Sequence, residues 1–220
     1  MHINDQVQVY IDTLKKYNLI DKIDTIFDIG SRDGEQAIDF ARRCPDKEVI
    51  LFEPIPSSGR ICGNNVINSK LDNISLYFVG LGQEDGFKDF YFTPGNIGVS
   101  SYKKPNMVPF GHTQEVQNIG IIQVIRADTF IALDSRPLNK IAIWMDAQGC
   151  ELDILKGFGD TLLDRVVSVF TEVSTDTYYQ DGCTYEEIDN YLHGYGYFKV
   201  EEIFEWERER NVIYINKNQI

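Results

Sequence analysis

The chain has 220 residues, 43% hydrophobic and 12% aromatic, which predicts one globular domain with a sizeable core and excludes a disordered chain. Its formal net charge of −13 argues against nucleic acid or an anionic membrane as the main partner and leaves a neutral small-molecule or saccharide substrate open. No signal peptide or membrane-length apolar run is recognisable. The four scattered cysteines form no CxxC pair, which indicates reduced thiols and a cytoplasmic localisation.

The first half of the chain alternates predicted helices and strands. Residues 5–19 have apolar side chains at helical spacing, so residues 1–22 are predicted to be an N-terminal helical extension. The elements that follow are a strand at 25–30, a helix at 34–43, a strand at 48–53, a helix at 57–69 and a strand at 74–80. Residues 87–92 and 121–126 are predicted as additional strands. The Gly- and Pro-rich segment 93–120 between them is expected to be a lid or substrate loop.

The second half continues the alternation. The predicted elements are strands at 140–146, 165–173, 197–204 and 211–216, with helices at 150–157 and 184–193. Nothing helical separates the last two strands, so they should pair antiparallel. Repeated strand–helix units predict an α/β fold with a mostly parallel sheet and helices on both faces. Such sheets bind ligands beyond the carboxyl ends of their strands.

The turn after the first strand, IGSRDG at residues 29–34, directs backbone N–H groups and a helix N-terminus toward a ligand. Asp28 precedes this turn, and Glu53 ends the next strand, 23 positions after Gly30, where a ribose diol commonly finds its acceptor. The turn lacks the GxGxxG pattern, and Asp33 would repel a pyrophosphate. A ligand with a nucleoside and a cationic or zwitterionic end, such as S-adenosylmethionine, suits this acidic rim. The alternative is that the glycines only permit a tight turn and Glu53 faces solvent.

Five stretches occur in an order that resembles the FkbM family of methyltransferases: IFDIGSRDGEQA, VILFEPIP, VGLGQEDGFKDFY, IWMDAQGCELDILKGF and VFTEVSTDTYY. The most specific part, MDAQGCELDILKG, is similar to the family signature D-x-E-G-x-E-x-x-x-L-K-G, with Gln148 in place of the commoner Glu. The resemblance implies a class I Rossmann-like methyltransferase fold with a seven-stranded sheet. It further implies S-adenosyl-L-methionine as donor, S-adenosyl-L-homocysteine as product, and hydroxyl oxygens of sugars or natural products as acceptors.

The cofactor contacts are predicted on the first turn and on the strand ends around it. These residues are Asp28, Gly30, Ser31, Gly34, Glu53, Pro54, Gly80, Leu81 and Asp146. The resemblance assigns the adenine side of the cofactor to Gly80-Leu81-Gly82, which could equally be an ordinary strand-end turn.

Two carboxylates are the catalytic candidates. Methyl transfer to an alcohol needs an acceptor lone pair held in line and a base that takes the proton. Asp146, at the end of the fourth strand, is the first candidate base, with a helix N-cap as its structural alternative. Glu172, near the end of the fifth strand, is the second. Together with Asp176 they could form an oxygen-only site for a divalent metal such as Mg²⁺, although nothing requires one.

The predicted substrate contacts are Tyr102, Gln148, Asp176 and Tyr178. Within the long segment, Tyr102 and Phe110 could stack on a sugar, and Lys103 could meet an acidic group, unless the segment is only a surface loop. The predicted function is therefore S-adenosylmethionine-dependent O-methylation of a hydroxyl group, most plausibly of a sugar or glycan. The alternatives are an inactive nucleotide-binding or regulatory module and a methyltransferase acting on a non-sugar natural product. The oligomeric state cannot be predicted.

Overall fold

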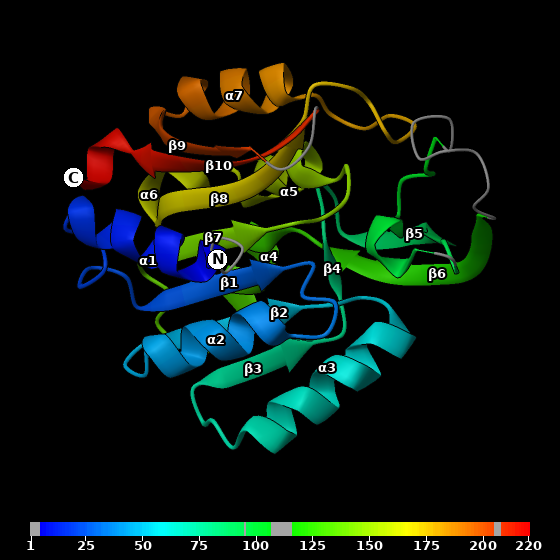
Figure 1. Ribbon diagram of the computed structural model, residues 1–220, viewed down its shortest axis with the longest axis horizontal. Coiled ribbons are helices and arrows are strands. Elements are labelled where there is room, and N and C mark those ends of the chain that lie inside the picture. The colour runs from blue at the N-terminus through cyan, green and yellow to red at the C-terminus, as the bar shows by residue number, and fades with distance from the viewer. Residues whose placement is uncertain (1–4, 95, 107–115, 205–207) are drawn as a thin grey trace.

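The computed structural model describes residues 5–94, 96–106, 116–204 and 208–220 (Figure 1). The main sheet contains β1 (Thr25–Ile29), β2 (Glu48–Phe52), β3 (Ile74–Tyr77), β7 (Ile141–Met145), β8 (Val166–Ser174), β9 (Tyr197–Phe204) and β10 (Glu209–Asn216). Within the described residues these seven strands have the order β3-β2-β1-β7-β8-β10-β9. Neighbouring strands are parallel except β10, which is antiparallel to both β8 and β9. The predicted Rossmann-like sheet with a C-terminal antiparallel strand is confirmed.

The central strands are buried along their whole length because helices cover both faces of the sheet. All residues of β1 (TIFDI) and β7 (IAIWM) are buried. Thr25 and Asp28 are the polar residues among them, and Asp28, which can carry a charge, is only 2% exposed. Burying a carboxyl group costs free energy unless hydrogen bonds compensate it. The buried Asp28 therefore marks the end of β1 as a candidate functional site.

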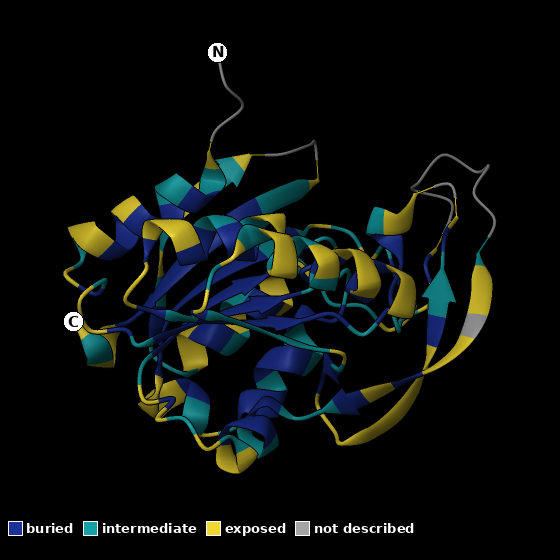
Figure 2. Ribbon diagram, turned by 90° about the horizontal axis from the view of Figure 1, so that it is seen from below, coloured by how far each residue is buried: buried dark blue, intermediate teal, exposed yellow. Residues whose placement is uncertain are grey.

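Helices lie on both faces of the sheet (Figure 1). One core cluster joins the sheet to α1 (Gln6–Lys16), α2 (Glu35–Arg43) and α3 (Pro56–Ser69). The other joins it to α4 (Ala127–Leu133), α5 (Glu151–Phe158), α6 (Thr161–Asp164) and α7 (Tyr185–Gly194). Figure 2 shows the buried strands between helices whose outer surfaces are exposed. The N-terminal helix is integral to this packing, because Tyr10 is fully buried and its hydroxyl donates to the Ile143 carbonyl at 3.0 Å.

A second sheet stands beside the main one. Among the described residues it contains β4 (Gly80–Leu81), β6 (Gln117–Ile125) and β5 (Gly86–Phe92), in that order. The predicted single strand at 74–80 is therefore wrong: β3 ends at Tyr77, and Gly80 pairs with Val124 of β6 instead. β3 is the edge of the main sheet, so the chain after it is free to join another set of strands. The additional strands predicted at 87–92 and 121–126 belong to this second sheet.

The segment 93–120 is only partly a loop. A 3-10 helix covers Ile97–Val99, and β6 begins at Gln117, so the last residues of the expected loop are strand. Residues 95 and 107–115, with Phe110 among them, lie outside the described residues. Whether this segment acts as a lid stays a prediction.

Gly157 has a packing role that differs from the predicted one. It was expected to end its helix, but α5 continues to Phe158 and its C-cap is Gly159. A Cβ at Gly157 would stand 2.1 Å from the carbonyl oxygen of Gly82. The missing side chain therefore lets α5 contact the turn that follows β4, which brings the second sheet against the main domain core.

Candidate active site

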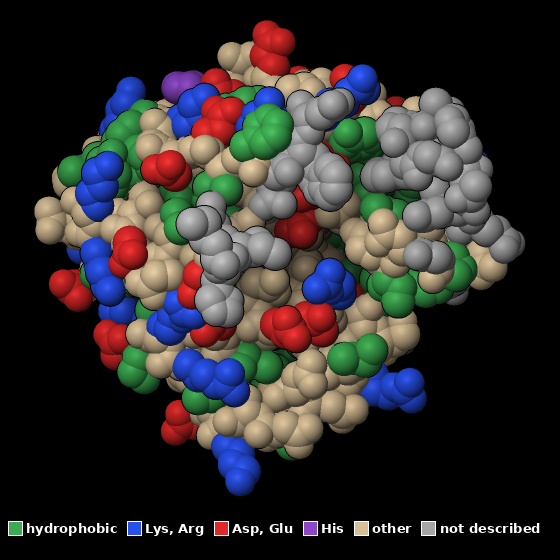
Figure 3. Space-filling view, in the orientation of Figure 1, with side chains coloured by type: hydrophobic (Ala, Val, Ile, Leu, Met, Phe, Trp, Pro, Cys, Tyr) green, Lys and Arg blue, Asp and Glu red, His purple; other side chains and the backbone are tan. Residues whose placement is uncertain are grey.

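A cavity of about 250 Å³ opens beyond the carboxyl ends of β1, β2 and β7. On the face seen in Figure 1, the surface is hollowed near its centre and acidic side chains lie at the hollow (Figure 3). Among the described residues, the carboxyl groups that line the cavity are Asp28, Glu53, Asp146 and Glu172. The basic residue in the same lining is Arg32. This balance favours a ligand that carries positive charge.

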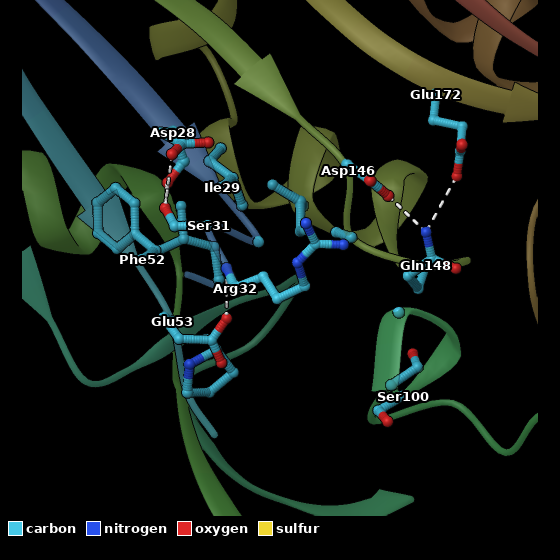
Figure 4. Close-up of a pocket in the computed structure, with 18 of the residues that line it drawn as sticks. Asp28, Ile29, Ser31, Arg32, Phe52, Glu53, Ser100, Asp146, Gln148 and Glu172 are labelled. Atoms are coloured by element: carbon cyan, nitrogen blue, oxygen red, sulfur yellow. Dashed lines mark hydrogen bonds between the residues drawn. The ribbon is translucent and has the colours of Figure 1, made fainter. Parts of the chain in front are cut away.

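The turn after β1 is held by Asp28. The Ser31 hydroxyl lies 2.8 Å from the Asp28 carboxylate and 3.0 Å from the Asp28 carbonyl oxygen, either of which can accept its hydrogen (Figure 4). Burial raises the pKa of Asp28 to about 7, although the Ser31 hydrogen bond opposes this change. Gly30 has φ +88° and donates its N–H to the Phe52 carbonyl at 3.1 Å. The turn is therefore tied to the ends of both β1 and β2.

Glu53 is buried, with 3% of its surface exposed, which excludes the alternative that it faces solvent. Its two carboxylate oxygens accept the backbone N–H groups of Arg32 and Ile55, each at 2.8 Å. Burial raises the pKa of Glu53 to about 7, and these backbone hydrogen bonds lower it in part. Each oxygen keeps a further lone pair, so an oriented carboxylate remains able to accept both hydroxyls of a ribose.

Replacing Glu53 with Ala is expected to weaken binding of S-adenosylhomocysteine by about 1.5–3 kcal/mol, the usual size of hydrogen bonds to a charged group. Isothermal titration calorimetry measures this change directly. Glu48→Ala is the matched control, because Glu48 begins β2, the strand that ends just before Glu53, and its side chain is 44% exposed. Unchanged affinity in the Glu53 variant, with an intact circular dichroism spectrum, would remove Glu53 from the cofactor site.

The turn after β7 joins two carboxyl groups through an amide. The Gln148 side-chain nitrogen donates to Asp146 at 2.5 Å and to Glu172 of β8 at 3.0 Å (Figure 4). The Gln148 side-chain oxygen accepts the Tyr179 hydroxyl at 2.6 Å. Helix α5 begins at Glu151 with Cys150 as its N-cap, so the alternative role of Asp146 as a helix cap is excluded.

Burial and the adjoining Asp146 carboxylate raise the pKa of Glu172 well above its usual range. Two carboxyl groups that share a site do not both ionise readily, because each negative charge disfavours the other. The raised pKa therefore favours a proton on Glu172 over one on Asp146. An arrangement of this kind can accept a proton from a neighbouring hydroxyl group.

Most of the predicted site residues line this one cavity. They are Asp28, Gly30, Ser31, Glu53, Pro54, Gly80, Leu81, Tyr102, Asp146, Gln148 and Glu172. Gly34 does not line it; its missing side chain makes room for Cys62, whose Sγ would stand 2.8 Å from a Cβ there. Asp176 and Tyr178 instead line an adjoining cavity of about 30 Å³, which Gln148 and Glu172 also line, and Asp176 pairs with Arg208.

The sequence reasoning missed cavity residues from distant parts of the chain. Gln6 of α1 and Asn211 of β10 both line the cavity, and the Asn211 amide donates to Gln6 at 3.1 Å. Ser100 and Ser101, which follow the 3-10 helix, contribute hydroxyl groups to the same wall. No local motif distinguishes these polar residues from ordinary surface residues, so only their position in the fold identifies them.

Residues 103–106, which end the described part of the segment before residue 107, are held against the rest of the chain by an ion pair and backbone hydrogen bonds. Lys103 pairs with Asp153 of α5 at 3.0 Å, and its side chain is 10% exposed. Its ammonium group also donates to the Asp181 carbonyl at 2.6 Å. Residues 104–106 pair with the backbone of residues 178–180. The structure thus gives Lys103 a partner within the chain in place of an acidic substrate group.

No group of three or more His, Cys, Asp or Glu side chains within the described ranges is arranged to hold a metal ion. Asp176 lines the adjoining cavity together with Glu172, and its carboxylate pairs with Arg208. All four cysteines are free thiols. In the part of the chain that the structure describes, no helix has the length and apolar character needed to cross a membrane.

The free energy of unfolding is expected to fall as pH rises from about 4.5 to about 7, by on the order of 1–3 kcal/mol for each buried carboxyl with a raised pKa. Burial raises the pKa of Asp28, Glu53 and Glu151 to about 7, whereas such groups have a pKa of about 4 in the unfolded chain. The folded protein therefore binds more protons than the unfolded chain in this window. Carboxyl groups with a lowered pKa, such as Asp134 beside Arg136, change the free energy of unfolding only at pH values below this window.

Urea denaturation at about pH 5 and about pH 7.5 measures this dependence. Glu53→Gln should reduce the slope, because an amide at this position no longer titrates. Stability that increases across the window would contradict the buried carboxyls described above.

The sheet order, its one reversed strand among the described residues, and an acidic cavity at the carboxyl edge define a class I methyltransferase fold. A family model described as the methyltransferase FkbM domain matches residues 28–199. The chain therefore belongs to the FkbM family and is an S-adenosylmethionine-dependent methyltransferase, as its sequence resemblance predicted.

Two curated relatives and two solved structures are similar to this chain. The 2-O-methyltransferase NoeI of Sinorhizobium fredii is 28% identical over 176 residues, which span 74% of this chain and 69% of NoeI. Methyltransferase 1 of Beauveria bassiana is 24% identical over 162 residues, spanning 67% of this chain and 64% of that protein. The human methyltransferase 10 domain containing protein superposes with a TM-score of 0.54 at 12% identity, covering 98% of this chain and 83% of that one.

The second structure is Streptococcus pneumoniae Sp1610 in complex with S-adenosyl-L-methionine, with a TM-score of 0.51 at 13% identity, covering 92% of this chain and 72% of that one. Sp1610 is described as a candidate tRNA (m1A22) methyltransferase. At these identities the structural likeness establishes the fold alone, so it does not by itself separate nucleic-acid acceptors from small ones.

Proposed function

We propose that the protein transfers the methyl group of S-adenosylmethionine to a hydroxyl oxygen of a sugar or glycan. The observation that carries this proposal is the Asp146–Glu172 pair, held by Gln148 on the opposite side of the cavity from Glu53 (Figure 4). An alcohol needs a base at neutral pH, and a carboxylate at the end of β7 supplies one where a nucleoside bound at Glu53 would direct its reactive end.

The residues of the β1 and β2 ends fit the cofactor by their chemistry. Glu53 offers oriented oxygens for the ribose hydroxyls, and the backbone of residues 30–32 offers close approach for the amino-acid part. Gly80 and Leu81 lie on the wall of the same cavity and would contact the adenine. When bound, S-adenosylmethionine supplies an electrophilic methyl group on a positively charged sulfur. An acidic lining suits that charge better than it suits a pyrophosphate.

In the proposed reaction, the acceptor hydroxyl lies against Asp146. Its proton passes to the Asp146 carboxylate while its oxygen forms a bond to the methyl carbon, and the bond between that carbon and sulfur breaks. The products are a methyl ether and the neutral thioether S-adenosylhomocysteine, and Asp146 then releases the proton to solvent. The raised pKa of Glu172 favours its protonated form, which leaves Asp146 as the member of the pair that is proposed to act as the base.

The acceptor is proposed to be a neutral saccharide. Ser100, Ser101, Gln6 and Asn211 line the cavity with groups that both donate and accept hydrogen bonds, which is what sugar hydroxyls require. The relative NoeI is named a 2-O-methyltransferase, which supports hydroxyl oxygen as the acceptor atom. The net charge of −13 disfavours a polyanionic acceptor such as tRNA. We further propose that residues 1–220 act as one cytoplasmic methyltransferase domain, with part of segment 93–120 on the acceptor side.

A methyl-transfer screen tests the function. The protein is incubated with S-adenosylmethionine labelled on its methyl group and with a panel of free sugars, nucleotide-linked sugars, non-sugar alcohols and tRNA. Label on a sugar hydroxyl is the expected result, whereas label on tRNA or on another alcohol would overturn the saccharide assignment. Calorimetric binding of S-adenosylhomocysteine without transfer to any acceptor would favour an inactive regulatory module.

A further inference from the structure

We infer that Gln148 is a positioning residue that takes the place of a divalent cation between the two carboxyl groups, so that methyl transfer needs no metal. This inference rests on the proposed function, because it concerns the carboxyl pair assigned there as the base. The residue between the two carboxyl groups is an amide, Gln148, and not a third carboxyl group. The structure gives that difference a chemical meaning.

The amide of Gln148 makes hydrogen bonds at both of its ends. Its nitrogen bridges Asp146 at 2.5 Å and Glu172 at 3.0 Å, so each hydrogen has its own carboxylate. Its oxygen accepts the Tyr179 hydroxyl at 2.6 Å. If the Gln148 amide bound a substrate, it would have to give up these hydrogen bonds. The structure therefore favours a role in which Gln148 holds the carboxyl pair over the predicted substrate contact.

The backbone and the Tyr179 ring hold this amide in place. Gln148 has φ +52° and the next residue, Gly149, has φ +88°. A non-glycine residue in this left-handed region is uncommon and persists where the surroundings over-determine it. A Cβ on Gly149 would lie 2.4 Å from the Tyr179 ring, so glycine is needed for the ring to pack there. Tyr179 is 5% exposed, and its hydroxyl also lies 3.2 Å from the Val99 carbonyl.

Glu151 holds the same turn through hydrogen bonds to its backbone. Its buried carboxylate accepts the N–H groups of Ala147 at 3.0 Å and Gly149 at 3.3 Å, on either side of Gln148. The conformation that aims the amide at the two carboxyls is thus fixed by side-chain and backbone contacts together.

A neutral amide and a cation would affect the carboxyl pair differently. A bound Mg²⁺ or Ca²⁺ would hold the carboxylates at a fixed spacing but would also make Asp146 a weaker base, because its charge stabilises the ionised form. An amide holds the same spacing through hydrogen bonds and leaves the negative charge available for the proton of the acceptor. A Glu at position 148 would replace these donors with a third carboxylate, which is the oxygen-rich ligand set that hard divalent cations prefer.

The test is the isosteric change Gln148→Glu. Calorimetry with MgCl2 and with CaCl2 is expected to show binding to the variant at least about 10-fold tighter than to the wild type, because three carboxylates then meet at one point. Gln180→Glu is the matched control: Gln180 is exposed and lines neither cavity, so the variant adds the same charge without a third ligand at the pair. Affinity for S-adenosylhomocysteine should stay the same in all three proteins, which checks that the site is folded.

Single-turnover methyl transfer provides the second measurement. Wild-type turnover should be unaffected by EDTA. Turnover of Gln148→Glu in EDTA should fall about 10²–10⁴-fold, the usual contribution of a general base, and should return in part on adding Mg²⁺. Tyr179→Phe keeps the ring over Gly149 and removes the hydroxyl that orients the amide, so its turnover should fall about 3–10-fold without loss of cofactor affinity. This variant decides the question if Gln148→Glu does not fold.

Three results would overturn the inference. They are wild-type turnover that EDTA abolishes and Mg²⁺ restores, equal Mg²⁺ affinity of the wild type and Gln148→Glu, and wild-type turnover of Tyr179→Phe. The calorimetric comparison measures metal binding without any acceptor, so its result does not depend on whether the proposed function is correct. Tighter metal binding by Gln148→Glu together with no methyl transfer by the wild type would reject the proposed function and leave the bridging role of Gln148 supported.

Discussion

Replacing Asp146 with Asn should lower single-turnover methyl transfer about 10²–10⁴-fold while leaving the affinity for S-adenosylhomocysteine nearly unchanged. Asn keeps the shape of the side chain, and its oxygen can still accept the hydrogen bond from Gln148, but it cannot take the proton of the acceptor hydroxyl. The N-cap position of the helix that follows is Cys150, four residues beyond Asp146, so a loss of turnover would not arise from a lost cap. Rapid-quench measurements at saturating cofactor give the rate.

Asp160→Asn is the control for this prediction. Asp160 is an exposed carboxylate just beyond α5 and lies outside the cavity, so the rate of this variant should equal the wild-type rate. A near-wild-type rate for Asp146→Asn would remove Asp146 from the mechanism. The search for the base would then move to Glu172, the other carboxyl of the pair.

Replacing Gly30 with Ala should lower the free energy of unfolding by about 2–4 kcal/mol and weaken cofactor binding at least about 10-fold. A Cβ at Gly30 would stand 2.0 Å from the carbonyl oxygen of Asp146, and φ is +88°. The turn after β1 and the turn after β7 touch at this point. A methyl group there would push the cofactor turn away from the carboxyl pair.

Gly196→Ala separates close approach from backbone strain. Gly196 has φ +84°, nearly the same as Gly30, but the nearest atom to its Cβ would be the Asn218 amide nitrogen at 3.4 Å, an ordinary contact. Gly196→Ala should therefore have only the smaller cost of the left-handed conformation. Urea denaturation and calorimetry with S-adenosylhomocysteine measure both effects. Equal losses of stability in the two variants would show that the contact between the two turns contributes nothing.

The fold could be predicted largely because burial repeats along the chain. Runs such as TIFDI and IAIWM are mainly apolar and do not alternate, as is typical of strands covered on both faces, and α1 has its apolar residues at helical spacing. The prediction failed at Gly80, which was joined to the strand before it. Its pairing partner, Val124, lies in a distant segment, and no periodicity near Gly80 reveals that choice. The short helix α4 was missed because seven residues show too little of the helical repeat.

The α/β class, the turn after the first strand and the acidic residues at strand ends could be predicted, because they depend on local patterns and on the topology of parallel sheets. What each of these residues contacts depends on the packing of distant segments. This packing buried Glu53 against two backbone N–H groups and brought Glu172 to Asp146. It also made Gln148 the bridge between the two carboxyl groups and paired Asp176 with Arg208. Contacts of this kind join residues of different strands and turns, and their geometry follows from packing, which no single stretch of sequence encodes.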